Sequence, residues 1–334
     1  MASSTSERLR GVNFGGWLLL EKWMTPTLFA GTNAEDEHSF VQTDGAKEKI
    51  EHHRQTFIQE EDFVWLANHG INAIRLPIGY WILEPDGPYV EGISYVDWAF
   101  AMADTYNFKI LLDLHGVPGS QNGKDHSGQI GRAAWLTDER KQDATLAILE
   151  RLHERYKSYA SYWGIQILNE PPFGLIQRVV RRFYRRAAAH IQGKTRIVFH
   201  DGFTPRLMSG ALGKDGRAVM DMHLYHMASF WGKFVSARQF VKHAPRFYGR
   251  LIRWVSRKQP VIIGEWSSVL DGRKTKNTPR EDAERLMLSF ARAQMAVFEQ
   301  YAIGWFYWNY KTEGRGVWNF RSLVEDDLLQ VTHK

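Results

Sequence analysis

Two short stretches of the 334-residue chain end in glutamates that can do chemistry. Residues 164–168 are mostly apolar and too few for a helix, and they deliver Asn169 and Glu170 just before two prolines. Residues 260–264 repeat this design and deliver Glu265. Such a run is typical of a buried strand in a parallel sheet. Hydrolysis of a glycosidic bond requires a carboxyl pair of this kind, one group donating a proton and the other attacking or activating water.

The elements that must position these glutamates follow from the hydrophobic periodicity. The sequence predicts eight strands with helices in most of the intervals, which indicates an α/β chain folded as a single (β/α)8 TIM barrel. The expected strands are residues 12–20, 71–78, 108–114, 164–168, 196–200, 218–225, 260–266 and 302–308. We expect residues 1–10 to be a polar N-terminal tail and residues 11–334 to form the catalytic barrel. Residues 25–50 and 117–134 are expected to be long loops over its mouth.

Polar and aromatic side chains collect at the carboxyl ends of the predicted strands, which is where barrel enzymes hold their active sites. They are Arg75, His115, Asn169, Glu170, His223, Tyr225, Glu265 and Trp308. We expect the charge of Arg75 and a hydrogen bond from Tyr225 to keep Glu265 ionised as the nucleophile. Glu170 is then the acid/base, and its neighbour Asn169 binds the sugar 2-hydroxyl.

Three alternatives bear on the remaining strand-end residues. His115 and His223 are either partners of sugar or carboxylate groups or satisfied core histidines. Metal-assisted hydrolysis has candidate ligands at Asp113, His115, His200, Asp201 and His223. However, no His-x-His pair opens the first strand and a metal scheme leaves both glutamates unused, so we expect no metal and no cofactor. A non-catalytic sugar-binding barrel is the third alternative, and the presence of both carboxyl groups argues against it.

Composition excludes several functions. The chain has no cysteine, which rules out disulfides, thiolate metal sites and cysteine nucleophiles. Its formal net charge is +6, with arginines gathered on two predicted helices near residues 178–186 and 246–257. Such faces can attract nucleic acid or anionic membranes. Because no nucleic-acid module accompanies them, we interpret them as solvent-exposed helix surfaces and expect no nucleic-acid partner.

The sequence also bears on localisation and assembly. No run is long enough to span a membrane, and residues 1–10 lack the apolar core of a signal peptide. The chain therefore indicates either a cytoplasmic protein or a secreted one whose leader has been removed. We expect it to be a monomer.

Seven short motifs occur in order along nearly the whole chain. They are residues 10–18 (RGVNFGGWL), 75–77 (RLP), 113–116 (DLHG), 119–123 (GSQNG), 168–171 (LNEP), 223–225 (HLY) and 264–266 (GEW). Together they resemble the family 5 glycoside hydrolases, and within them the exo-β-1,3-glucanase branch. The resemblance implies a retaining mechanism without a metal, with Glu170 as acid/base and Glu265 as nucleophile. It also implies that the subsite of the cleaved glycosyl unit is lined by Glu21, Arg75, His115, Asn169, His223, Tyr225 and Trp308.

The chain departs from this branch at the entrance of the site. After residues 121–123 the branch usually presents Phe-Asp-Asn, whereas this chain has Lys124, Asp125 and His126. In the branch, the phenylalanine clamps the sugar at the entrance and the two residues after it bind sugar. We expect Asp125 to keep this sugar-binding role and His126 to stand in place of the asparagine, while Lys124 leaves the site without the clamp aromatic. Residues 226–230 similarly lack the second clamp aromatic or displace it. We predict an exo-acting β-1,3-glucanase with a weaker acceptor site, the alternatives being β-1,6 or β-1,4 specificity, endo cleavage, or transglycosylation.

Overall fold

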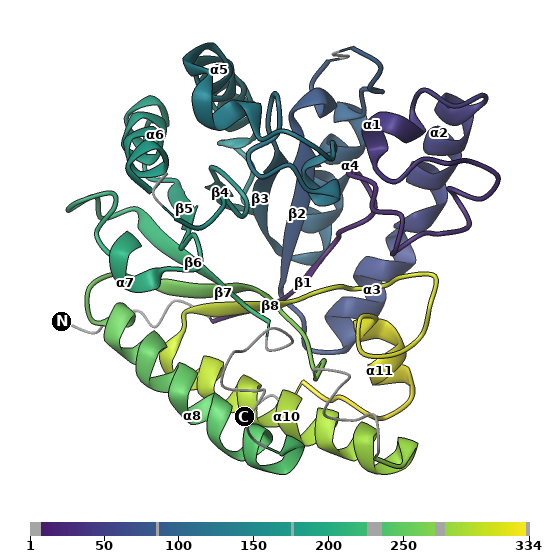
Figure 1. Ribbon diagram of the computed structural model, residues 1–334, viewed down its shortest axis with the longest axis vertical. Coiled ribbons are helices and arrows are strands. Elements are labelled where there is room, and N and C mark those ends of the chain that lie inside the picture. The colour runs from purple at the N-terminus through teal and green to yellow at the C-terminus, as the bar shows by residue number, and fades with distance from the viewer. Residues whose placement is uncertain (1–7, 85–86, 175–176, 226–235, 271–277, 332–334) are drawn as a thin grey trace.

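Eight parallel strands close into one barrel in chain order (Figure 1). The structure is a computed structural model that describes residues 8–84, 87–174, 177–225, 236–270 and 278–331. The strands are β1 Leu9–Asn13, β2 Ala73–Gly79, β3 Lys109–Gly116, β4 Tyr162–Gln166, β5 Arg196–His200, β6 Ala218–Leu224, β7 Val261–Trp266 and β8 Gly304–Tyr307. The predicted (β/α)8 barrel is thereby confirmed.

Helices surround this barrel (Figure 1). They are α1 Glu37–Phe40, α2 Ala46–Phe57, α3 Glu60–Asn68, α4 Ile93–Tyr106, α5 Glu139–Tyr156, α6 Gln177–His190, α7 Pro205–Met208, α8 Ala237–Ser256, α10 Arg280–Tyr301 and α11 Phe320–Glu325, with 3-10 turns at Tyr80–Ile82, Asp125–Ser127 and Ala134–Thr137. Helices α8 and α10 lie side by side and share a small apolar cluster around Phe240 and Phe290. Within the described ranges, no helix combines the length and apolarity that a bilayer crossing needs.

The barrel interior changes from apolar to polar along the strands. Near the amino-terminal ends of the strands, the interior holds an apolar cluster to which seven strands contribute one residue each. Its members are Leu9, Ala73, Leu111, Val198, Val219, Ile262 and Phe306. Side chains on a strand alternate in direction, so the residues two positions later face the same interior. These residues include Arg75, Asp113, His200, Asp221 and Trp308. Strand periodicity therefore places the polar residues above an apolar floor, at the carboxyl-terminal end where barrel chemistry occurs.

The start of the barrel differs from expectation. Strand β1 begins at Leu9 and ends at Asn13, whereas we predicted a tail to residue 10 and a strand over 12–20. Leu9 is buried in the barrel floor, and Arg10 forms an ion pair with Glu299 (Nε–Oε1 2.8 Å), so both belong to the barrel. The strand stops early because Gly16 adopts a left-handed conformation (φ 72°) that turns the chain.

The predicted loop over residues 25–50 is wrong in its second half. Helices α1 and α2 occupy most of residues 37–57, and α3 then begins at Glu60. Helix α2 buries few apolar side chains and is held partly by polar contacts. Trp17 Nε1 donates to the carbonyl of Arg54 (2.8 Å), and Arg54 Nη1 donates to the carbonyl of Glu91 (2.6 Å). A helix anchored in this way lacks the apolar stripe by which sequence periodicity finds helices.

Candidate active site

Glu170 and Glu265 meet at the carboxyl-terminal mouth of the barrel. Glu265 lies within β7, and Glu170 lies four residues beyond the end of β4. The Nδ1 atom of His223 is 2.7 Å from Glu170 Oε1 and 3.4 Å from Glu265 Oε2. Those two oxygens are therefore no farther apart than the sum of these distances. Glu170 has a left-handed backbone (φ 37°), a strained conformation that costs a non-glycine residue about 1–3 kcal/mol and that clusters at functional sites.

The Glu265 carboxylate has the two neighbours that the sequence predicts. Arg75 Nη1 donates to Oε1 at 2.8 Å, and the Tyr225 hydroxyl donates to Oε2 at 2.8 Å. The Glu265 side chain is nearly buried. A cation and a phenol thus each donate a hydrogen bond to this carboxyl group and fix its orientation.

Arg75 is fully buried and fixed by a set of acceptors. Burial alone would lower its pKa, but the charges of Asp113 and Glu265 outweigh burial and raise the pKa above the ordinary arginine value. Its guanidinium is therefore a permanent charge in a fixed place. The acceptors are Asn13, Asp113, Gln166, Asn169 and Glu265, at 2.8–2.9 Å.

The Glu170 carboxyl is paired with His223, which is itself held from behind. His223 Nε2 is 3.0 Å from Asp221 Oδ2, and the Gly264 N–H donates to Asp221 Oδ1 at 2.6 Å. Position 264 requires glycine, because a Cβ there would lie 2.3 Å from the Asp221 carboxylate. The other oxygen, Glu170 Oε2, is 3.6 Å from His126 Nε2.

The His223–Glu170 pair shares a proton between two groups with opposite pKa shifts. Burial tends to lower the pKa of His223, but Glu265, Asp221 and the hydrogen bond to Glu170 raise it well above its usual value. Burial likewise tends to raise the pKa of Glu170, but the hydrogen bond and charge of His223 lower it overall. The resting pair is thus an imidazolium next to a carboxylate, and its titration belongs to both residues together.

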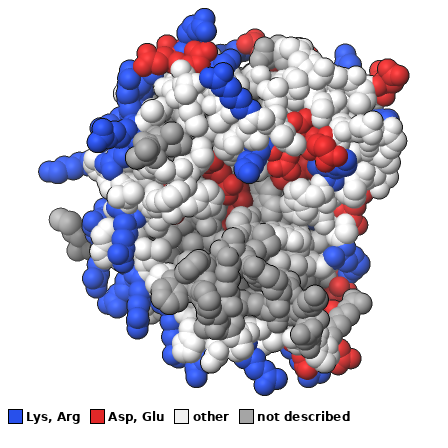
Figure 2. All heavy atoms as spheres, viewed as in Figure 1, with Lys and Arg blue, Asp and Glu red and all other residues white. Residues whose placement is uncertain are grey.

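A pocket of about 350 Å³ opens above these groups. Figure 2 shows acidic atoms in the hollow near the middle of this face. Its lining residues are Glu21, Trp23, His115, Asp125, His126, Asn169, Glu170, Phe203, Tyr225, Glu265, Trp308 and Trp318. The structure therefore brings together every predicted site residue. Arg75 and His223 are the two that lie behind the pocket wall instead of lining it.

His115 and Glu21 are buried polar groups on the pocket wall. His115 Nδ1 contacts Asp113 Oδ2 (2.6 Å), and its Nε2 contacts Asn169 Nδ2 (3.1 Å). Burial lowers the pKa of His115 well below its usual value, so the ring is neutral and its Nε2 accepts from the amide. Burial raises the pKa of Glu21 to about 8, against the opposing hydrogen bond from Trp23. Glu21 can therefore hydrogen-bond a sugar hydroxyl without bringing a net charge at neutral pH, whereas Asp113 and Asn169 already engage both ring nitrogens of His115.

The sequence did not predict several residues that the site contains. Asp221 had a usable signal, because it lies two residues before His223 and therefore on the same face of β6. Trp23, Phe203 and Trp318 lie outside the strands, where no periodicity marks a side chain as facing a pocket. Phe203 has a left-handed backbone (φ 57°) and is 48% exposed, so an aromatic ring is present at the mouth from the β5 side. Residues 226–230, for which the sequence predicts a missing or displaced second entrance aromatic, lie outside the described residues.

A metal-like cluster lies next to the carboxyl pair. Glu170, His200 and His223 offer ligand atoms within 4.8 Å of one another. His200 Nδ1 accepts the N–H of Gly202 (2.9 Å), so its Nε2 carries the ring proton and has no lone pair for a metal. Both ring nitrogens of His223 are already engaged, Nδ1 by Glu170 and Nε2 by Asp221. The donor chemistry of this cluster therefore does not suit a metal ion.

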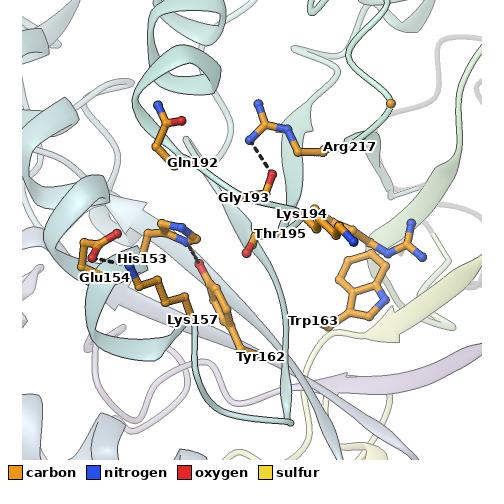
Figure 3. Close-up of a pocket in the computed structure, with 12 residues that line it drawn as sticks. His153, Glu154, Lys157, Tyr162, Trp163, Gln192, Gly193, Lys194, Thr195 and Arg217 are labelled. Carbon is orange, nitrogen blue, oxygen red and sulfur yellow. Dashed lines mark hydrogen bonds and ion pairs between the residues drawn. The ribbon is translucent and has the colours of Figure 1, made fainter.

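A second hollow lies at the opposite end of the strands (Figure 3). It has a volume of about 690 Å³ and lies where β4, β5 and β6 begin. Its acidic lining residue, Glu154, forms an ion pair with Lys157, and Tyr162 contacts His153. Without a second carboxyl group this hollow cannot carry out two-carboxyl hydrolysis.

A (β/α)8 barrel with two facing carboxyl groups at its carboxyl-terminal mouth has the architecture of a glycosidase. The sequence profile of the cellulase family (glycosyl hydrolase family 5) matches residues 35–314. The protein named "Probable glucan 1,3-beta-glucosidase A" of Emericella nidulans is 33% identical over 373 aligned residues, covering 98% of this chain and 91% of the relative. A "Glucan 1,3-beta-glucosidase" of Blumeria graminis is 32% identical, covering 97% and 87%. The chain belongs to glycosyl hydrolase family 5 and is a glycosidase.

Solved structures support the same fold. A rutinosidase from Aspergillus niger superimposes with a TM-score of 0.80 at 20% identity, covering 98% of this chain and 99% of that one. A Pseudomonas stutzeri endoglucanase, Cel5A, superimposes with a TM-score of 0.60 at 19% identity, covering 96% and 92%. At such identities the likeness concerns the barrel alone.

Proposed function

We propose that the protein is an exo-acting β-1,3-glucanase that retains anomeric configuration. The observation that carries the proposal is the pair of glutamate oxygens that contact one nitrogen of His223 inside a pocket of about 350 Å³. Inverting glycosidases hold their carboxyl groups about 6.5–9.5 Å apart, and retaining ones about 5–5.5 Å apart. Because Glu170 Oε1 and Glu265 Oε2 both contact His223 Nδ1, the separation of these two oxygens is smaller than the inverting range. This short separation supports double displacement.

In the first step Glu265 attacks the anomeric carbon while the leaving oxygen takes a proton. Hydrogen bonds from Arg75 and Tyr225 orient the attacking carboxylate. The bond from the anomeric carbon to the glycosidic oxygen breaks, and a glycosyl ester of Glu265 forms. Asn169, whose oxygen is fixed by Arg75, is placed to hydrogen-bond the sugar 2-hydroxyl, a contact that strengthens in the transition state.

The departing sugar receives its proton from the His223–Glu170 pair. Although the resting pair is an imidazolium and a carboxylate, their 2.7 Å hydrogen bond lets the proton move to Glu170 when the leaving oxygen demands it. In the second step Glu170 accepts a proton from water, and the hydroxide cleaves the ester with net retention. Asp221 holds His223 in line for both steps.

The cutting mode and linkage rest on the pocket and on the relatives. Glu21 and Asp125 line the pocket and are suited to the far hydroxyls of a terminal glucose. Glu37 of α1 accepts from the backbone N–H of Leu20 (2.8 Å) and from Trp81 Nε1 (3.0 Å), which anchors the chain next to Glu21. A pocket walled in this way favours chain ends. The relatives named glucan 1,3-beta-glucosidases support the β-1,3 linkage.

Incubation with laminari-, gentio- and cello-oligosaccharides tests this proposal. We expect glucose to be released one unit at a time from the non-reducing end of the β-1,3 series, with the β-anomer as the first-formed product by NMR. Retained glucose release with slower use of long acceptors would fit the loss of the clamp aromatic at Lys124. Mid-chain cleavage, activity confined to another linkage, or an α-anomer as first product would contradict the proposal.

Metal chelation should leave the activity unchanged. The proposed steps use protein side chains without a cation, and the tautomer of His200 makes the neighbouring cluster a poor ligand set. We expect prolonged treatment with EDTA, followed by gel filtration, to change kcat/KM by less than about two-fold. Loss of activity that zinc or manganese restores would favour metal-assisted hydrolysis instead.

A further inference from the structure

Helix α8 carries a row of exposed cations. Its members recur at intervals of three and four residues, which places them on one face of the helix. The helix contains no aspartate or glutamate, and within the described ranges none of these cations forms an ion pair. Figure 2 shows the corresponding lower-left flank as predominantly basic. The α8 cationic row consists of Arg238, Lys242, Arg246, Arg250, Arg253 and Arg257.

The other arginine-rich helix, α6, is different. Arg182 forms an ion pair with Glu139 of α5 (3.0 Å), and Arg186 pairs with Asp143. Arg181 Nη1 donates to the carbonyl of Leu207 (2.6 Å). The basic face of α6 is therefore used within the protein, whereas like charges along α8 repel one another and pair with no acidic group among the described residues. The two helices, which look alike in sequence, have different surroundings.

Exposed apolar side chains flank the α8 cationic row. Phe247 of α8 is 60% exposed, and Leu207 of α7 is 61% exposed. Two cations lie over the ring of Trp254. The ring centroid is 3.9 Å from Lys258 Nζ and 5.8 Å from Arg206 Cζ. Cations mixed with exposed aromatic and aliphatic groups match the boundary between lipid headgroups and acyl chains.

We propose that α8 is a docking surface for an anionic lipid bilayer. A helix of 20 residues spans about 30 Å, so the row meets many headgroups at once. Phe240 and Ala244 pack in the cluster shared with α10, and Ile252 packs in the main core, so the outer face of α8 is presented without further ordering. A linear polyanion would be bound by the cations alone and would leave Phe247 without a role. Helix α8 lies on the flank of the barrel (Figure 1), and none of its residues lines the pocket.

Vesicle co-sedimentation of the full chain tests the proposal. With vesicles of 70% phosphatidylcholine and 30% phosphatidylserine we expect binding at 0.1 M NaCl and release at 0.5 M, where charges are screened over a shorter distance. Pure phosphatidylcholine should not bind. Each basic residue near an anionic surface strengthens binding about five-fold, so the double variant Arg246→Glu/Arg250→Glu should bind at least about 25-fold more weakly.

A matched control separates the row from net charge. Lys47 and Lys49 are exposed on α2, far from α8 in Figure 1, and the variant Lys47→Glu/Lys49→Glu changes the net charge equally. It should bind within about two-fold of the unaltered protein. The variant Phe247→Ser should bind more weakly to vesicles and equally well to heparin. All variants should cleave laminari-oligosaccharides at the rate of the parent chain, since none of these residues lines the pocket.

Four outcomes would overturn the proposal. They are no binding to the anionic vesicles, an equal loss in both double variants, vesicle binding indifferent to Phe247→Ser, and heparin binding stronger than vesicle binding. The last two outcomes would assign α8 to a soluble polyanion. None of them bears on the glycosidase proposal, which the sugar assays test separately.

Discussion

Replacing Glu265 with glutamine should lower kcat on laminari-oligosaccharides by a factor of about 10⁴ or more, the loss expected when a catalytic nucleophile is removed. The amide cannot form the glycosyl ester. The amide oxygen of glutamine can still accept a hydrogen bond from Arg75, as Glu265 Oε1 does at 2.8 Å from Nη1. The buried guanidinium therefore keeps a partner. We expect the Tm of this variant to stay close to that of the parent, and KM to change little. Steady-state kinetics and thermal unfolding check these expectations.

Two further variants give the result a chemical signature. The shorter Glu265→Ala variant leaves space for a fluoride, so α-glucosyl fluoride should act as a donor and yield longer β-linked products. Tyr225→Phe removes only the hydrogen bond to Oε2 and should cost about 10- to 100-fold in kcat/KM. A Glu265→Gln enzyme with near-normal activity on glucan, or one that has unfolded, would mean that Glu265 is a structural partner of Arg75 and not the nucleophile.

The site was largely predictable where strands carry it. Arg75, Glu265 and Trp308 occupy strands or their ends, and the period of two in β2, β7 and β8 orients such side chains with little help from tertiary contacts. The contacts of Arg75 and Tyr225 with Glu265 followed from charge and hydrogen-bond chemistry, and the structure has both. Strand periodicity could not predict which of these side chains contact one another. That His223 joins both glutamates depends on the spatial neighbourhood of three strands.

The remaining features depend on loops and polar anchoring. Phe203 reaches the pocket through a left-handed backbone conformation that no sequence pattern signals. Helix α2 is tied down by side-chain contacts to backbone carbonyls, which resemble the contacts of a loop when only sequence is available. The arginines of α6 and α8 looked equivalent because ion pairing depends on α5, a partner 43 residues from Arg186 in the chain.

The second large effect is expected from Glu170→Gln, and it should depend on the leaving group. A departing sugar needs a proton, so cleavage of laminaribiose should fall by about 10²–10⁴-fold. With 2,4-dinitrophenyl β-glucoside the leaving group needs no proton, so the glycosyl-enzyme should form at nearly the normal rate. That intermediate should accumulate because no base activates water, giving a burst followed by slow turnover and a low KM. Azide should speed the turnover and yield β-glucosyl azide.

The pH profile provides the matching test of the proton held by His223 and Glu170. Because its acidic neighbours raise the pKa of His223 well above the usual value, the pair keeps its proton to a higher pH than a free histidine would, and parent activity on laminaribiose should fall as pH rises through the value for the pair. In Glu170→Gln this alkaline fall should disappear from the dinitrophenyl reaction. Glu154→Gln, in the hollow at the other end of the barrel, should behave like the parent. Equal losses for good and poor leaving groups would show that Glu170 positions the substrate but does not protonate it, and the acid would then have to be sought in His126, whose Nε2 lies 3.6 Å from the same carboxylate.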